Sequence, residues 1–226
     1  AIQYERNHIL DFLLTEVPVQ GLAIAAAVDK GDRELLLKLF RHGWSINTPL
    51  DRFEPLVLSR IRNDAALAEW LVNLGADPSA GCEINETPLS CAVTYADLSV
   101  VFLLLETDPD LKKGYVMHSA VHRQPSSLEL IWRLAKKGAP YDNTLWEDPR
   151  SFRFRGHLKR GTPLHDACRD RNVEVARVLL DMGAKADRPH RIGTTNVPPT
   201  PREIAARGGC RDLELLFEGR SNDWLE

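Results

Sequence analysis

The chain has 226 residues, of which 43% are hydrophobic, enough for a folded core. Its 14 glycines and 14 prolines are close to average usage, which excludes a collagen-like or largely disordered sequence. The 29 basic and 32 acidic residues give a formal net charge of −3, so bulk charge indicates no class of partner. No run approaches the roughly 18 apolar residues of a membrane span, and residues 1–20 lack a signal-peptide pattern.

The four cysteines favour a reducing compartment. Cys82, Cys91, Cys168 and Cys210 form no CxxC pair, and a domain of this size needs no disulfides. We therefore expect an intracellular protein, cytoplasmic or nuclear. No close Cys–Cys or Cys–His pair has the spacing of a zinc site, so we expect no metal. Cys82 is predicted to be exposed, and Cys91 and Cys168 to be buried.

The chain begins with a predicted helix within residues 1–20. Its apolar residues at 9, 10, 12, 13 and 14 suit a capping helix at the end of a larger array. Six similar segments follow, starting near residues 22, 54, 87, 115, 162 and 200. The first two spacings are 32 and 33 residues, and the later ones are irregular.

Each segment has the same local pattern. Residues 162–184, TPLHDACRDRNVEVARVLLDMGA, show it most fully. Thr-Pro suits a helix start, because Thr caps the helix and Pro lacks only an N–H that would be unpaired there. An apolar second helix follows, and a glycine stands where its end requires a left-handed residue. We expect Gly43, Gly75, Gly138 and Gly183 in that role.

This pattern resembles the ankyrin repeat, through TPLHDA at 162–167 and LLDMGA at 179–184. The resemblance implies an all-α solenoid of about six stacked helix-turn-helix units with β-hairpin-like finger loops, a single domain over residues 1–226. It also implies structural roles for His118 and His165, with hydrogen bonds between neighbouring units. Asp108-Pro109 replaces Gly-Ala in the third unit, so we expect a distorted helix end there. Trp70 and Trp132, in second helices, are predicted to be core.

Two stretches interrupt the period, residues 144–160 and 188–199, at the positions of fingers. Charge concentrates around them: residues 150–211 hold 14 basic and 6 acidic residues, a net charge of +8, whereas residues 1–149 carry −7 and residues 212–226 carry −4. The densest part is RSFRFRGHLKR at 150–160. One interpretation is a basic, aromatic finger that binds a partner. The other is a loop whose Phe residues pack on their own solenoid, and in that case the FRF alternation could form a short strand.

No catalytic signature occurs, and we predict neither catalytic residues nor a cofactor. His118 and His122 are one helical turn apart, but no Glu follows His118 as in the metalloprotease signature. His118 is expected in the interior and His122 nearer the surface.

The resemblance instead implies recognition of a protein partner in a concave groove, by an adaptor, inhibitor or targeting subunit. The residues expected there lie before the turns of the first helices or on the fingers: Arg62, Tyr95, His122, Arg123, Trp146, Phe152, Arg153, Phe154, Arg155, Arg169, Asp170 and Arg207.

Two other functions remain open from the sequence. One is an enzyme with a pocket built by the loops 144–160 and 188–199, near His122, His157 and Arg169. The other is nucleic-acid or phosphate binding through residues 150–160. We favour a protein or peptide partner with an acidic segment, and a chain that is monomeric outside its complex.

Overall fold

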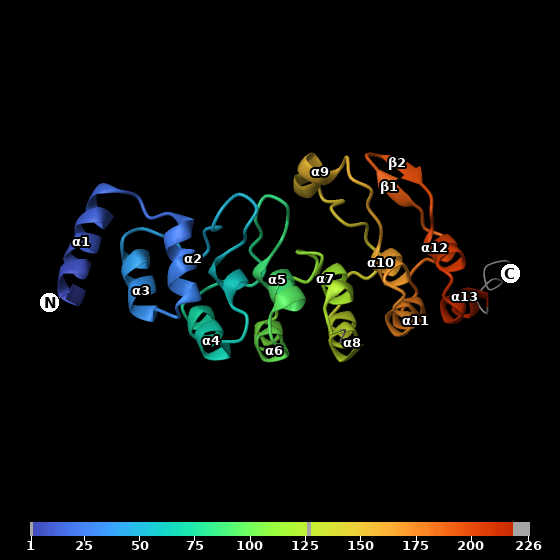
Figure 1. Ribbon diagram of the computed structural model, residues 1–226, viewed down its shortest axis with the longest axis horizontal. Coiled ribbons are helices and arrows are strands. Elements are labelled where there is room, and N and C mark those ends of the chain that lie inside the picture. Colours follow the sequence, from blue (N-terminus) through green and yellow to red (C-terminus); the bar gives the residue numbers. More distant parts are fainter. Residues whose placement is uncertain (1, 126–127, 219–226) are drawn as a thin grey trace. The chain divides into compact units, whose positions relative to one another are not determined.

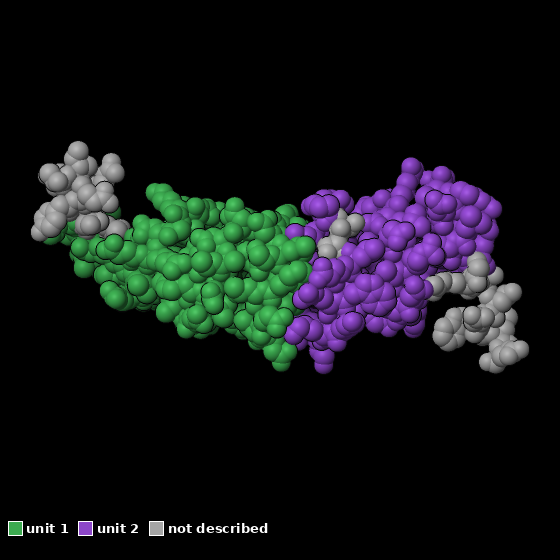
Figure 2. Space-filling model, turned by 90° about the horizontal axis from the view of Figure 1, so that it is seen from below, with its two compact units in different colours: residues 1–82, 86–109 green, residues 83–85, 110–226 purple. Residues whose placement is uncertain are grey.

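The computed structural model describes residues 2–125 and 128–218, and they are mostly helical (Figure 1). The contacts divide the chain into two compact units, drawn in two colours in Figure 2. Unit 1 comprises residues 1–82 and 86–109, and unit 2 comprises residues 83–85 and 110–226. None of the described helices is both long and apolar enough to cross a membrane.

Unit 1 begins with α1 (Ile2–Glu16), on which the apolar side chains of Ile9, Phe12 and Leu13 are exposed. Lys38 of α3 forms an ion pair with Asp11 of α1. Three helix pairs follow: α2 (Gly21–Asp29) with α3 (Arg33–Arg41), η1 (Val57–Arg60) with α4 (Ala65–Asn73), and α5 (Pro88–Tyr95) with α6 (Leu98–Glu106). The short 3₁₀ helix η1 packs between α2 and α5, where a first helix is expected.

Unit 2 contains three further helix pairs: α7 (Val116–His122) with α8 (Leu128–Lys136), α10 (Pro163–Arg169) with α11 (Val173–Asp181), and α12 (Pro201–Arg207) with α13 (Arg211–Glu218). The first helices pack on one another in the order α7, α10, α12, and the second helices in the order α8, α11, α13. Each unit therefore shows the stacking expected from the repeats.

The two interruptions of the period are structured parts of unit 2. Residues 144–160 contain the helix α9 (Pro149–Arg155), so the short strand considered for the FRF alternation is not formed. Residues 188–199 contain the antiparallel strands β1 (His190–Ile192) and β2 (Thr195–Val197), with His190 opposite Val197. In Figure 1, α9 and this hairpin lie on the side of α10 away from α11.

Local sequence explains most helix boundaries. Thr87 and Thr200 form capping boxes with Ser90 and Glu203, as their Thr-Pro starts predict. Short polar residues also cap second helices: the backbone N–H groups of Leu35, Leu67 and Val175 donate to the side chains of Asp32, Asp64 and Asn172.

The glycines predicted to end second helices all have a positive φ, between 86° and 97°. Asp108 stands at the matching place after α6 and also takes a left-handed conformation, with a φ of 54°. The turn is kept because Asp tolerates this conformation better than most side chains do. The hydrogen bonds of this helix end still differ: Ala76, Ala139 and Ala184 donate their N–H to Leu71, Leu134 and Leu179, but Pro109, in the matching place, has no N–H to donate. The helix end is therefore altered, as the replacement of Gly-Ala predicts. The core lies between the helices of each pair, where leucines are at most 2% exposed: Leu36, Leu39, Leu71 and Leu104 in unit 1, and Leu130, Leu134, Leu179 and Leu213 in unit 2.

Candidate functional site

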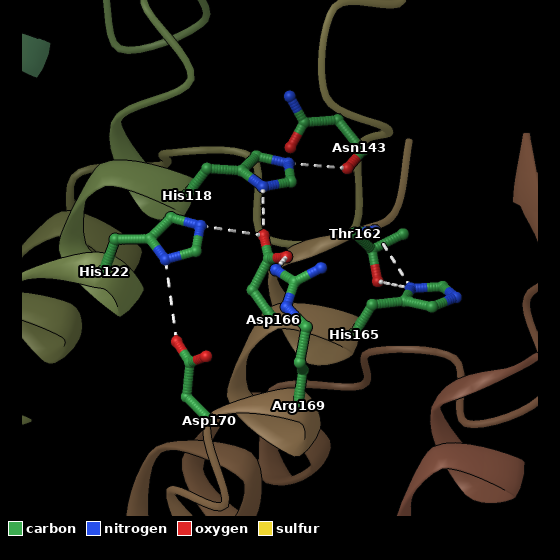
Figure 3. A network of polar contacts seen from close by, with 8 residues as sticks. All are labelled: His118, His122, Asn143, Thr162, His165, Asp166, Arg169 and Asp170. Carbon is green, nitrogen blue, oxygen red and sulfur yellow. Dashed lines mark hydrogen bonds and ion pairs between the residues drawn. The ribbon is translucent and has the colours of Figure 1, made fainter. Parts of the chain in front are cut away.

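A buried carboxylate joins the first helices of two neighbouring repeats in unit 2 (Figure 3). Asp166 lies on α10, which packs against α7. Its Oδ2 is 3.1 Å from Nδ1 of His118 and 3.3 Å from Nε2 of His122, both on α7. Its Oδ1 accepts a hydrogen bond from the guanidinium of Arg169, one turn further along α10. Three basic side chains therefore converge on one carboxylate.

This arrangement keeps Asp166 ionised. Burial alone disfavours a charged carboxylate, but the hydrogen bonds from His118 and His122 outweigh it and hold the pKa of Asp166 well below its usual range. The hydrogen bond to Asp166 in turn raises the pKa of His122, against a smaller opposing effect of burial. Asp170, with Oδ2 3.6 Å from Nδ1 of His122, acts in the same direction.

His118 also connects the helices to a finger. Its Nε2 lies 3.1 Å from the backbone carbonyl oxygen of Asn143, while Nδ1 faces the carboxylate of Asp166. Both ring nitrogens of His118 thus face oxygen atoms, one of the next repeat and one of the finger. The interior position predicted for His118 is confirmed, since it is buried, whereas His122 is exposed.

His165 is structural, but in the described part of the chain it hydrogen-bonds within its own repeat and not between neighbouring units as the resemblance implies. The backbone N–H of Thr162 donates to Nδ1 of His165 over 2.9 Å, which closes the first turn of α10. Its ring lies edge-on to that of His190 on β1, with centroids 4.0 Å apart. Burial, with the neighbouring His190, lowers the pKa of His165 to about 3, so this ring is neutral in the fold.

The exposed residues predicted on the first helices of unit 2 lie at the ends of α7, α10 and α12. His122, Arg169, Asp170 and Arg207 are exposed, and Arg123 is half-buried. The Asp166 carboxylate brings His122 and Arg169 together, and Asp170 lies next to His122. Arg207, at the end of α12, is not part of this network.

In unit 1, two of the residues predicted to bind a partner, Arg62 and Tyr95, contact each other. The guanidinium of Arg62 lies 4.9 Å from the ring centroid of Tyr95, and Tyr95 is 67% exposed. Arg62 is also exposed, and its backbone carbonyl accepts from the N–H of Asp97 over 2.6 Å. An exposed aromatic ring stacked with an arginine is a typical anchor of protein interfaces.

In the finger of unit 2, the predicted aromatic residues are paired with arginines of their own unit. Guanidinium groups lie over the rings of Trp146 (Arg155, 5.5 Å), Phe154 (Arg153, 5.8 Å) and Phe152 (Arg160, 4.9 Å). All three aromatic residues are half-buried. The sequence left open whether these rings grip a partner or pack on the solenoid, and their contacts favour packing.

The position of α9 is fixed by its first residues. The carboxylate of Asp148 accepts from the backbone N–H groups of Arg150 and Ser151 and from the hydroxyl of Tyr115. The Ser151 hydroxyl donates to the carbonyl of Ile84 over 2.6 Å. Burial raises the pKa of Tyr115, with a further contribution from Asp148, so the hydroxyl remains a donor. The helix is therefore held at its start by residues far apart in the sequence.

The fold and the repeat are also found in known proteins. The human ASB11 ankyrin repeat domain is 22% identical and has a TM-score of 0.59, and the match covers 90% of this chain and 85% of that one. The ankyrin repeat domain of Bcl-3, described as a unique member of the IkappaB protein family, is 17% identical with a TM-score of 0.61, over 88% of this chain and 86% of that one. An ankyrin repeat domain from Acinetobacter baumannii AYE is 19% identical with a TM-score of 0.59, over 87% of this chain and 96% of that one. A family model described as ankyrin repeat matches residues 161–191. The chain carries an ankyrin repeat and has the ankyrin-repeat fold.

One curated relative shares a short segment with this ankyrin-repeat chain. It is the potassium channel AKT3 of Oryza sativa subsp. japonica, 45% identical over 56 residues. The match covers 25% of this chain and spans 6% of the length of the channel.

Two burial predictions for the ankyrin repeats are wrong, and two more hold only in part, since Cys91 and Trp70 are half-buried. Cys82 was expected to be exposed in a finger, but it is only 3% exposed. The backbone of this finger folds back on itself, since the N–H of Cys82 donates to the carbonyl of Glu86. Trp132 was expected in the core but is 42% exposed, because α8 turns Leu130, Ile131 and Leu134 inward and leaves Trp132 on its outer side.

Two of the cysteine thiols, those of Cys91 and Cys168, lie on first helices. Burial raises the pKa of both Cys91 and Cys168 to about 12, so these thiols stay protonated near neutral pH. Within the described part of the chain, no group of three or more His, Cys, Asp or Glu side chains is arranged to hold a metal ion.

Sequence reasoning selected the exposed members of the network and missed its centre. Asp166 stands inside the TPLHDA pattern, where it reads as one more helical residue. The sequence does place Asp166 three residues before Arg169, and this spacing on a helix predicts a local ion pair. Arg160 was noted only within the basic finger, and nothing in its local sequence indicates that it is buried.

Proposed function

We propose that this chain is a non-catalytic recognition module that binds a protein partner on the exposed ends of its first helices. Ankyrin-repeat domains are generally protein–protein interaction modules, and the match of residues 161–191 and the solved neighbours support that role here. An adaptor, an inhibitor or a targeting subunit would all use such a surface.

The observation that carries the proposal is the network around Asp166. A buried carboxylate holds the exposed side chains of His122 and Arg169 in fixed positions before any partner binds. Side chains that are already ordered lose less conformational entropy on binding, and this raises affinity. Arginine can then donate to a partner's carboxylate or carbonyl groups.

Three further parts of the proposal follow from the sequence. The partner offers an acidic segment to the basic part of unit 2, the protein acts inside the cell, in the cytoplasm or nucleus, and it is monomeric outside its complex. None of the four cysteines forms a disulfide, which supports a reducing compartment. The single domain over residues 1–226 also stays a prediction.

A comparison of two triple variants tests the proposal. The first, Tyr95→Ala/Arg123→Ala/Arg169→Ala, alters the first-helix ends. The second, Trp132→Ala/Glu129→Ala/Arg177→Ala, alters exposed side chains of second helices and serves as a matched control. Both variants and the unchanged chain are used as bait in a lysate of the cells that make the protein, with mass spectrometry as readout.

A partner should be retained by the unchanged chain and the control but lost by the first variant. That partner, once purified, should bind the unchanged chain at least tenfold more tightly than the first variant in calorimetry. Equal retention by all three baits would contradict the proposal, provided that circular dichroism shows all three folded.

A further inference from the structure

The α9–hairpin region of unit 2 contains two arginines that face each other across an antiparallel bridge. Arg160 and Arg191 exchange both backbone hydrogen bonds, over 2.9 and 2.8 Å. Residues directly opposite in such a pair project their side chains to the same face, and like charges placed there repel. The two guanidinium groups therefore share one face of the finger.

Neither guanidinium has a carboxylate partner among the described residues. Arg160 is 1% exposed and donates only to the backbone carbonyls of Trp146 and Gly193, over 3.2 and 2.6 Å. Arg191 is half-buried and its guanidinium makes no hydrogen bond in the described part of the chain. The Nε atoms of both arginines are buried without an acceptor. A buried charge normally has a paired counter-charge, so this pair lacks a partner.

Three further cations lie in the last turn of α9 and just after it. Arg153 and Lys159 are exposed and Arg155 is half-buried, and none of them forms an ion pair with a described carboxylate. The N–H of Gly193, in the hairpin turn, donates to the carbonyl of Gly156, at the end of α9. We call Arg153, Arg155, Lys159, Arg160 and Arg191 the basic finger surface.

The nearby acidic residues do not neutralise this surface. Asp148 is engaged as the cap of α9 and accepts from Tyr115. Burial lowers the pKa of Arg160, and the charge of Arg191 lowers it further. Glu147 raises this pKa, but its effect is too small to reverse the shift. The buried charge of Arg160 therefore adds to the field of the exposed cations around it.

We propose that the basic finger surface binds an acidic segment of a protein partner, with its Asp or Glu carboxylates accepting from Arg191 and the exposed cations. This rests on the protein-binding function proposed above and names the residues that hold the acidic segment. A carboxylate placed beside Arg191 supplies the counter-charge that the bridged arginine pair lacks. The charge-assisted bonds between guanidinium and carboxylate are among the strongest available to a protein surface.

The contacts of the aromatic side chains argue against single-stranded nucleic acid. Proteins that bind it stack bases on aromatic rings. Here the rings of Trp146, Phe152 and Phe154 are half-buried, and guanidinium groups of the same unit lie over them. The surface thus offers cations without the stacking platforms that bases require.

Fluorescence anisotropy with a labelled (Glu-Ser)₆ peptide tests the inference, with (Gln-Ser)₆ as the uncharged probe. The test variant Arg153→Gln/Arg191→Gln removes two charges from the basic finger surface. The control Lys136→Gln/Arg177→Gln removes two exposed charges from the second helices α8 and α11. We expect the acidic peptide to bind, and the test variant to weaken it about tenfold, as two lost ion pairs imply. The control should change the affinity less than threefold.

The same experiment contains the outcomes that overturn the inference. The inference is wrong if the unchanged chain binds both peptides equally well, or if it does not bind the acidic peptide. It is also wrong if the test and control variants lose affinity for the acidic peptide to the same extent. Tighter binding of a single-stranded oligonucleotide of equal charge, or of phosphatidylserine vesicles, would replace the acidic peptide with that ligand.

Thermal melting separates folding from binding. Arg191→Gln removes a like charge opposite Arg160, so its melting temperature without peptide should match or exceed that of the unchanged chain. A lower melting temperature would show that Arg191 serves the fold, and would overturn the role given to it.

The two proposals can fail separately. The variant Tyr95→Ala/Arg123→Ala/Arg169→Ala leaves the basic finger surface intact. If it loses the partner while the acidic peptide fails to bind the unchanged chain, the acidic segment is wrong, and recognition of a partner at the first-helix ends stands. If the peptide binds but no partner depends on the first-helix ends, the proposed function is wrong at that surface.

Discussion

The Nε2 atom of His122 lies 3.3 Å from Oδ2 of Asp166, so the last residue of α7 contacts a buried carboxylate of the next repeat. His122 is exposed and Asp166 is not, so the contact couples a surface side chain to the interior. Through Asp166, the same contact also reaches His118 and Arg169.

Asp166→Ala should strongly destabilise the fold. It removes the partner of the buried His118 and of two more basic groups, and breaking one side of a buried ion pair costs about 3–5 kcal/mol. Urea unfolding measures the loss. Asp170→Ala, which touches only the exposed edge of the network, is the control and should cost less than about 1 kcal/mol. Similar losses in the two variants would contradict the central role of Asp166.

The contribution of His122 to stability should depend on pH. Its pKa is raised in the fold by Asp166, so the folded state binds the proton more tightly than the unfolded chain does. The stabilisation is complete below the unfolded pKa, about 6.5, and is lost as the pH rises through the folded value. Urea unfolding of the unchanged chain and of His122→Gln, from pH 5.5 to 8.5, should show a difference that shrinks with rising pH. A constant difference would argue against this pairing.

The His165–His190 pair should act in the opposite direction. Burial lowers the pKa of both rings, to about 3 for His165, so the unfolded chain binds more protons below pH 6.5. The stability from this pair is present above the unfolded pKa and is lost as the pH falls towards the folded values. His190→Gln should therefore flatten the fall of stability between pH 6.5 and 4, measured by urea unfolding. An unchanged slope in the variant would show that other groups cause the acid sensitivity.

Asp64→Ala should destabilise unit 1 by about 1 kcal/mol, because the N–H of Leu67 loses its capping acceptor at the start of α4. Glu69→Ala, an exposed change within the same helix, provides the comparison and should lie within about 0.5 kcal/mol of the unchanged chain. Chemical denaturation of both variants checks the expectation. A neutral Asp64→Ala would mean that water replaces the cap without cost.

The residues near helix ends explain why so much of the fold was predictable. The Thr-Pro starts at Thr87 and Thr200 and the left-handed turn at Gly75 act within three or four residues. Such short-range preferences are written in the local sequence, and six repetitions reinforce them. At Asp108-Pro109 the sequence predicted an altered helix end, and Pro109 indeed lacks the N–H that closes the other ends, while the left-handed Asp108 preserves the turn itself.

Tertiary structure alone decided which side chains meet. His118 and Asp166 are 48 residues apart, and only the packing of α7 on α10 brings them together. The burial of Cys82 and Arg160 and the exposure of Trp132 likewise depend on which surface each element turns inward. The sequence by itself determined the repeats, their caps and the basic character of residues 150–211, since these depend on neighbours along the chain. The polar network around Asp166 and the backbone pairing of Arg160 with Arg191 could be found only in the tertiary structure, because the residues that meet come from distant segments of the chain.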